Sequence, residues 1–202
     1  WESFPKNNRL FSTGVFDVEE APDGSFWFAT DKGLSRYNGE DWRTYSVGDK
    51  ALSNDLVGLA AASDGRVWFM ASDGIIGAIY EETVTMYPIN GESFGLPESI
   101  RVRAIAAGPD GGIVAAGEWS DPETGQTFND IFQFDGTSWH LDPATAELRD
   151  TSVNQIQVAP DGTRWLATGD GLMRFDNAGL ESFTINGPRD NVIRTLITDR
   201  RN

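Results

Sequence analysis

Hydrophobic residues recur along the chain in short runs of four to six, and turn-forming residues separate the runs. Alternation over so few residues, bounded by Gly, Asp, Asn and Pro, is typical of short strands joined by tight turns. The first repeat contains four such runs: Val15–Glu20, Phe26–Ala29, Leu34–Tyr37 and Trp42–Tyr45. We expect a type I′ hairpin turn at the Asp23-Gly24 pair that separates the first two, because Gly tolerates positive φ.

The Asp-Gly pair returns in the same context three more times. The four copies start at Asp23, Asp64, Asp110 and Asp161, at intervals of 41, 46 and 51 residues. Four antiparallel strands every 40 to 50 residues is the rhythm of β-propeller blades. A parallel sheet would need helical stretches of about 10 to 15 residues between its strands, and the sequence shows no convincing ones.

The sequence therefore predicts an all-β protein, a β-propeller of four-stranded antiparallel blades in one domain spanning residues 1–202. The expected blades cover about 15–56, 57–101, 102–152 and 153–191. Residues 1–14 and 192–202 are interpreted as strands of incomplete blades. Because those two pieces would leave strand edges unpaired in a closed ring, we expect a segment of a propeller of roughly six to eight blades. A five-bladed ring with an incomplete seam is the alternative.

Large aromatic residues occupy equivalent positions in the repeats. Trp27, Trp68 and Trp165 share a place in the second strand, and Trp42 and Trp139 share one in the fourth. A blade cannot cover its own two faces, so neighbouring blades share a core. We interpret these tryptophans as packing between blades, not as a ligand cage.

The repeat resembles the two-component regulator propeller repeat. The first repeat carries its pattern as Pro22-Asp23-Gly24-Ser25-Phe26-Trp27-Phe28-Ala29-Thr30 and Gly33-Leu34-Ser35-Arg36-Tyr37, and the fourth as residues 160–168 and 171–175. Residues 52–57 and 190–193 resemble its inter-repeat segment. The resemblance covers nearly the whole chain and is weakest in repeat 3, where Val114 replaces the Trp. It implies an extracytoplasmic (periplasmic or cell-surface) sensor region of a bacterial signalling protein, feeding a histidine kinase or diguanylate cyclase. It offers no catalytic residues.

Composition limits the partners. A net charge of −15 and a pI near 4.3 argue against nucleic acid and anionic membrane surfaces, which would repel the chain. No apolar run approaches the roughly 18 residues of a membrane span, so we expect no membrane insertion by this segment. The absence of cysteine excludes disulfides and thiolate metal sites.

The largest departure from the repeat is an insertion in repeat 3, between its second and third strands. It runs from Glu118 to Asp130 and includes Trp119, Asp121 and Phe128. Departures are better functional clues than consensus loops. Aromatic rings beside carboxylates suit a carbohydrate or peptide ligand, because a ring stacks while polar groups fix orientation. The alternative is a long surface hairpin whose Trp119 folds back onto the protein.

Charged residues near the loops supply further candidates. Asp31, Asp73 and Asp170 occupy equivalent loops and would attract a cation at a channel mouth, although an Asp before Gly more often shapes the turn. Arg101 and Arg103 start repeat 3 and offer positive counterparts. We expect no bound metal and no cofactor.

Catalytic residues are not evident. The one histidine, His140, lies on an expected outer strand without partners for a triad. We therefore expect no catalytic residues and no enzyme, but a ligand- or partner-binding sensor module. A protein-interaction or structural scaffold, and a propeller lyase or glycosidase, are the alternatives.

Overall fold

The computed structural model describes residues 10, 12, 14–45, 55–96, 100–142, 148, 151–176, 178–184 and 192–197. The chain divides into two compact units, an N-terminal unit of residues Trp1–Pro88 and a C-terminal unit of residues Ile89–Asn202. Each unit is described by itself below. The expected strand at Trp1–Phe4 lies outside the described residues.

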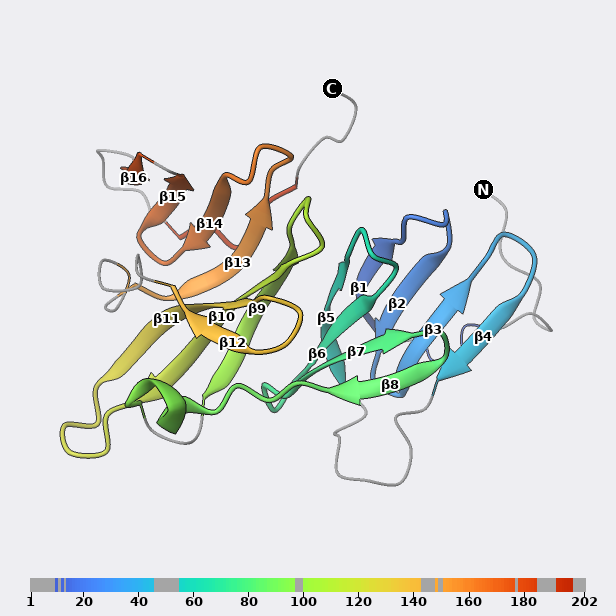
Figure 1. Ribbon diagram of the computed structural model, residues 1–202, viewed down its shortest axis with the longest axis horizontal. Coiled ribbons are helices and arrows are strands. Elements are labelled where there is room, and N and C mark those ends of the chain that lie inside the picture. Colours follow the sequence, from blue (N-terminus) through green and yellow to red (C-terminus); the bar gives the residue numbers. More distant parts are fainter. Residues whose placement is uncertain are drawn as a thin grey trace. The chain divides into compact units, whose positions relative to one another are not determined.

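The N-terminal unit contains two four-stranded antiparallel sheets, in which strands pair in chain order (Figure 1). Blade 1 consists of β1 (Val15–Glu20), β2 (Phe26–Thr30), β3 (Gly33–Tyr37) and β4 (Trp42–Tyr45). Blade 2 consists of β5 (Leu56–Ala61), β6 (Val67–Ala71), β7 (Ile76–Tyr80) and β8 (Thr83–Met86). The four strands expected in the first repeat are all present, two of them one residue longer than expected.

The C-terminal unit begins with a short 3-10 helix, η1 (Gly91–Phe94), followed by two sheets of the same topology. Blade 3 consists of β9 (Arg101–Ala107), β10 (Ile113–Ser120), β11 (Thr127–Phe134) and β12 (Trp139–Leu141). Blade 4 consists of β13 (Val153–Val158), β14 (Arg164–Thr168), β15 (Gly171–Asp176) and β16 (Gly179–Phe183). The all-β prediction, with four-stranded antiparallel blades, is confirmed. No described helix has the length and apolar character to cross a membrane.

The Asp-Gly turns differ from the type I′ expectation. The Gly24 amide donates to the Ala21 carbonyl at 2.9 Å, and the Ala21 amide donates to the Ser25 carbonyl at 2.8 Å. Gly24 has φ of 79° but Asp23 does not have positive φ, whereas a type I′ turn needs it at both central residues. The loop is instead a three-residue turn that ends in a left-handed glycine. The carboxylate of Asp23 accepts the Ser25 amide at 2.9 Å and so fixes this turn.

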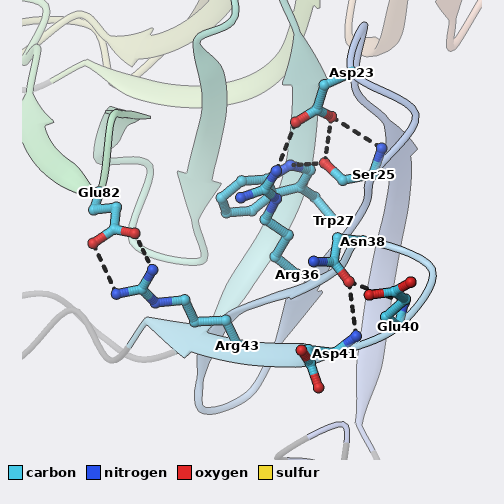
Figure 2. A network of polar contacts seen from close by, with 9 residues as sticks. All are labelled: Asp23, Ser25, Trp27, Arg36, Asn38, Glu40, Asp41, Arg43 and Glu82. Atoms are coloured by element: carbon cyan, nitrogen blue, oxygen red, sulfur yellow. Dashed lines mark hydrogen bonds and ion pairs between the residues drawn. The ribbon is translucent and has the colours of Figure 1, made fainter.

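The repeated motif forms one polar network around its tryptophan (Figure 2). Asp23 also accepts from the Ser25 hydroxyl and from Arg36, both at 2.6 Å, and Trp27 donates its indole N–H to Ser25 Oγ at 3.2 Å. The Arg36 guanidinium lies 5.6 Å from the centre of the Trp27 ring. The hydrogen bonds from Ser25, and then the charge of Arg36, lower the pKa of Asp23 below its ordinary value. Blade 4 repeats these residue types at Asp161, Thr163, Trp165 and Arg174.

Trp27 packs between blades, as expected, whereas Trp42 and Trp139 lie against aromatic rings of their own blades. Trp27 is 6% exposed and belongs to a core cluster that includes Leu59, Val67 and Phe69 of blade 2. In the C-terminal unit, a second cluster joins blades 3 and 4, and Val114 occupies the tryptophan position there. Burial of apolar side chains at about 25 cal/mol per Å² makes these shared clusters the main stabilising contribution within each unit.

Each first strand contains a β-bulge at the same place. Its pairing with the second strand skips one residue, namely Phe16, Val57, Arg103 or Asn154. In β1 and β13 the residue after the bulge contacts the segment that follows in the same unit. Asp17 accepts the amide of Leu59 in β5 at 2.8 Å, and Gln155 accepts the amide of Leu196 at 2.5 Å.

The segment Val192–Ile197 therefore lies against β13 as β5 lies against β1. Two further contacts hold it there. The Ile193 amide donates to the Thr168 carbonyl at 2.9 Å, and the Asn154 side-chain amide donates to the Ile193 carbonyl at 2.8 Å. This is the place of a first strand in a following blade. Whether all 202 residues form one domain, and how many blades the complete propeller has, stay predictions.

The buried carboxylate of Asp17 gives a test of the inter-blade contact. Burial raises the pKa of Asp17 above its ordinary value of 3.8, although the amides of Leu59 and Val18 act to lower it. Asp17→Asn keeps an acceptor but removes the desolvated charge, so we expect it to stabilise the protein at pH 7. Asp17→Ala leaves the Leu59 amide unsatisfied and should destabilise it by about 1–2 kcal/mol. Guanidinium denaturation measures both.

The pH dependence of the unfolding free energy tests the direction of the Asp17 pKa shift. A carboxyl group whose pKa is raised on folding favours the folded state most below its unfolded pKa, and this contribution is lost as the pH rises through the folded pKa. The advantage of Asp17→Asn over the natural chain should therefore shrink as the pH falls towards 3.8. An advantage that grows at low pH would contradict the burial of this carboxylate.

Candidate functional site

The repeat-3 insertion extends a hairpin instead of forming an open loop. Strands β10 and β11 are eight residues each and pair continuously up to Ser120 and Thr127. Asp121 shapes the turn beyond them, because its carboxylate accepts the amides of Glu123 at 2.7 Å and Thr124 at 3.1 Å. These bonds lower the pKa of Asp121. The Asp121 carboxylate thus stabilises the turn of the hairpin.

The aromatic residues of the insertion pair with each other. Trp119 and Phe128 lie directly opposite on β10 and β11, with ring centres 4.9 Å apart and planes tilted by 34°. The indole N–H of Trp119 donates to Asp130 at 2.6 Å, and Asp130 is fully buried. Trp119 therefore folds back onto its own hairpin, and both rings are half-buried.

The predicted charged residues lie on the other face of this hairpin. Residues directly opposite in neighbouring strands share a face, and successive residues alternate. Arg101 of β9, Glu118 of β10 and Asn129 of β11 form one such cross-strand row. Arg103, displaced by the bulge, donates to the Glu118 carboxylate at 2.7 and 3.0 Å. The structure thus brings Arg101, Arg103 and Glu118 together and separates them from Trp119 and Phe128.

Asn129 is a member of this row that the sequence did not single out. Its side chain is 5% exposed, and its Oδ1 has no hydrogen-bond partner among the residues that the structure describes. A buried acceptor without a donor costs about 1–3 kcal/mol, so such groups call for an explanation. The one signal for it was the register of the hairpin, which places it opposite Glu118. We name Arg101, Arg103, Glu118 and Asn129 the polar row.

The three repeated loop acids serve their own loops. Asp73 accepts the Ile75 amide at 3.1 Å, Asp170 accepts the Thr151 hydroxyl at 3.3 Å, and Asp31 accepts the Ser12 hydroxyl. Over the described ranges of the chain, no group of three His, Asp or Glu side chains is placed to hold a metal ion.

A groove of about 620 Å³ lies between the Asp-Gly turns of blades 1 and 2. Its lining includes Asp23, Trp27, Arg36 and Glu82, which belong to the network of Figure 2. Asp23 pairs with Arg36, and Glu82 pairs with Arg43 at 2.7 Å, so these charges are engaged within the protein. The polar row, with its unpartnered buried acceptor, is the better candidate site.

Comparison with known proteins supports the fold. No protein-family model and no curated protein matches the sequence. A streptogramin B lyase structure is similar at 16% identity and a TM-score of 0.59, over 86% of this chain and 55% of that one. A gluconolactonase from Xanthomonas campestris is similar at 12% identity and a TM-score of 0.55, over 83% of this chain and 61% of that one.

A third similar structure is the extracellular domain of a protein described as a hybrid two-component system from B. thetaiotaomicron. The identity is 17% and the TM-score 0.50, over 93% of this chain and 31% of that domain. At such identities the likeness shows the fold alone, which is that of a β-propeller. The chain spans between about a third and three-fifths of the length of these structures.

The prediction that the chain is not an enzyme is contradicted by this comparison, because two of these three propellers are a lyase and a lactonase. The prediction relied on the lone histidine and on a resemblance that offers no catalytic residues. His140 is exposed and pairs with Asp135 at 2.7 Å. The hydrogen bond from the Ser138 amide, followed by those from His140 and the Thr137 amide, lowers the pKa of Asp135 to about 2. The position of His140 argues only against chemistry by that histidine.

The Trp119–Asp130 hydrogen bond gives a test of the hairpin. Trp119→Phe keeps an aromatic ring against Phe128 but leaves a buried carboxylate without its indole donor. We expect a loss of about 1–3 kcal/mol in the free energy of unfolding, measured by chemical denaturation. Phe128→Leu, which weakens the ring contact and keeps the hydrogen bond, is the control and should cost less. An equal or larger loss in the control would show that the hydrogen bond contributes little.

Proposed function

We propose that the chain is the ligand-binding propeller region of an extracytoplasmic sensor in a bacterial signalling protein. The motif at Pro22–Tyr37, which resembles the two-component regulator propeller repeat, supports this proposal. So does the fold that the chain shares with the extracellular domain from B. thetaiotaomicron. A sensor of this kind binds its ligand outside the cytoplasm and passes the signal to a separate output domain.

The polar row is the proposed ligand site, and the buried Oδ1 of Asn129 is the observation that carries it. This acceptor has no donor among the described residues, and a ligand hydroxyl or amide would supply one. Glu118 and Arg103 beside it supply a charged acceptor and a donor fork of fixed orientation, since each already holds the other. A carbohydrate or a peptide offers the complementary groups. Trp119 and Phe128 support the hairpin from its other face.

Asn129→Ala tests this site once a ligand is found by screening oligosaccharides and peptides with calorimetry. Loss of one hydrogen bond to a buried acceptor should weaken binding about 5- to 30-fold. Thr137→Ala, on the exposed β11–β12 turn, is the control and should leave the affinity unchanged. Unchanged affinity in Asn129→Ala would remove the polar row from the site. A screen without any ligand, with a folded protein partner captured instead, would favour a scaffold.

A second candidate function is catalysis on the ligand that the polar row holds. The likeness to a lyase and a lactonase favours it at the level of the fold. Glu118 is the carboxylate of the row and would be the acid or base. Prolonged incubation of the bound ligand, followed by mass spectrometry, tests it. Product that appears with the natural chain and is lost in Glu118→Gln would establish an enzyme.

A further inference from the structure

The first strands of the C-terminal unit have an unusual charge for this protein. The chain as a whole carries −15. Yet β9, β13 and the segment Val192–Ile197 contain three arginines, Arg101, Arg103 and Arg194, and no acidic residue. The corresponding strand β1 of the N-terminal unit contains three acids. Three of the chain's 13 arginines thus lie on segments that carry no acidic residue.

These three segments lie next to one another. Strand β9 packs against β13, and Figure 1 shows them side by side. The segment Val192–Ile197 follows on the other side of β13, held by the contacts from Gln155 to Leu196 and from Asn154 to Ile193. The order across the unit is therefore β9, β13 and Val192–Ile197.

The polar side chains occupy the same repeat position on the three segments. Arg103 and Asn154 are the bulge residues of β9 and β13. The Leu196 amide donates to the side chain of Gln155 as the Leu59 amide donates to that of Asp17. Leu196 therefore corresponds to Leu59. Two residues earlier, Arg194 then corresponds to Val57, the bulge residue of β5. A bulge turns its residue out of the regular pleat, and such residues often line functional sites.

The repeat does not require a polar residue at this bulge position. Its residues in the N-terminal unit are Phe16 and Val57. In the C-terminal unit they are Arg103, Asn154 and Arg194, all exposed. Blade formation requires the bulge, since all four first strands have one, but it does not require arginine there.

We propose that Arg103, Asn154 and Arg194 form a binding site for a small polyanion with carboxylate or phosphate groups, with Arg101 beside it. Guanidinium groups bind such oxyanions through two parallel hydrogen bonds, and an amide N–H adds a neutral donor. Two arginines on the segments that flank β13 suit a ligand with at least two negative groups. The site rests on the proposed function for its role, since it names the chemical class of the ligand sensed beside the polar row.

The net negative charge of the chain does not prevent this binding. Charges farther away than the Debye length, about 8 Å at physiological ionic strength, are largely screened. Arg103 is also oriented in advance, because Glu118 holds two of its nitrogens. One carboxylate on this pair leaves the remaining donors of a guanidinium, which has five N–H groups, for a ligand.

Titration calorimetry of the full chain with citrate and, separately, with inorganic phosphate at 0.15 M salt tests the proposal, and the stronger probe identifies the oxyanion class. We expect one binding site, weakened about 10-fold or more by Arg194→Gln, since a charge-assisted hydrogen bond contributes about 1.5–3 kcal/mol. Arg66→Gln, which removes an arginine of blade 2 paired with Asp64, is the matched control and should bind as the natural chain does.

Two outcomes overturn the proposal. One is a lack of binding by either probe, and the other is binding that Arg194→Gln and Arg66→Gln weaken equally. Arg194 is exposed, so its replacement should not unfold the chain, and equal melting temperatures check this. A neutral ligand that depends on Asn129 and ignores Arg194→Gln would leave the proposed function standing and remove this inference. Citrate binding that Asn129→Ala leaves unchanged would support this inference and remove the polar row from the ligand site.

Discussion

Each blade is a sheet with two largely apolar faces, and no blade covers both from within. This constraint explains most of the repeated residues. Trp27 fills the space towards blade 2, and Val114 takes its place between blades 3 and 4. The polar motif then holds the tryptophan in position, because Asp23 fixes both the turn and the Arg36 that covers the ring. The motif is thus a device for joining blades, and its charges are used within the protein.

The candidates for function are the residues that are not needed to pack one blade against the next. The long β10–β11 hairpin departs from the repeat. The polar residues Arg103, Asn154 and Arg194, at the bulge position of the C-terminal unit, depart from it as well. Both lie in the same unit, and Arg103 belongs to both, because the bulge in β9 turns it towards Glu118. In the proposed site, the buried acceptor at Asn129 and the exposed guanidinium groups at Arg103 and Arg194 would bind a ligand with donors and negative groups.

The local parts of the fold could be read from the sequence, and the register-dependent parts could not. Turn residues and short hydrophobic runs locate Val15–Glu20 and Trp42–Tyr45 because strands and turns depend on neighbouring residues. Glu118 and Trp119 looked like one site, yet adjacent strand residues face opposite ways, and the insertion proved to be strand. Asn129 needs the pairing of β10 with β11 to be noticed, and Arg194 needs a contact across blades. The prediction that the chain is not an enzyme was wrong to rely on His140, because a lone histidine excludes only chemistry by that residue.

The central claim is that, within their own units, β5 lies against β1 and Val192–Ile197 lies against β13 by the same contact, which places Arg194 beside Asn154. Amide hydrogen exchange followed by NMR tests it most directly. Leu59 and Leu196 each donate to a side chain of the preceding blade, so the account predicts that both amides are protected from exchange. Protection of Leu59 with free exchange at Leu196 would contradict it, because the segment Val192–Ile197 would then not be held against β13.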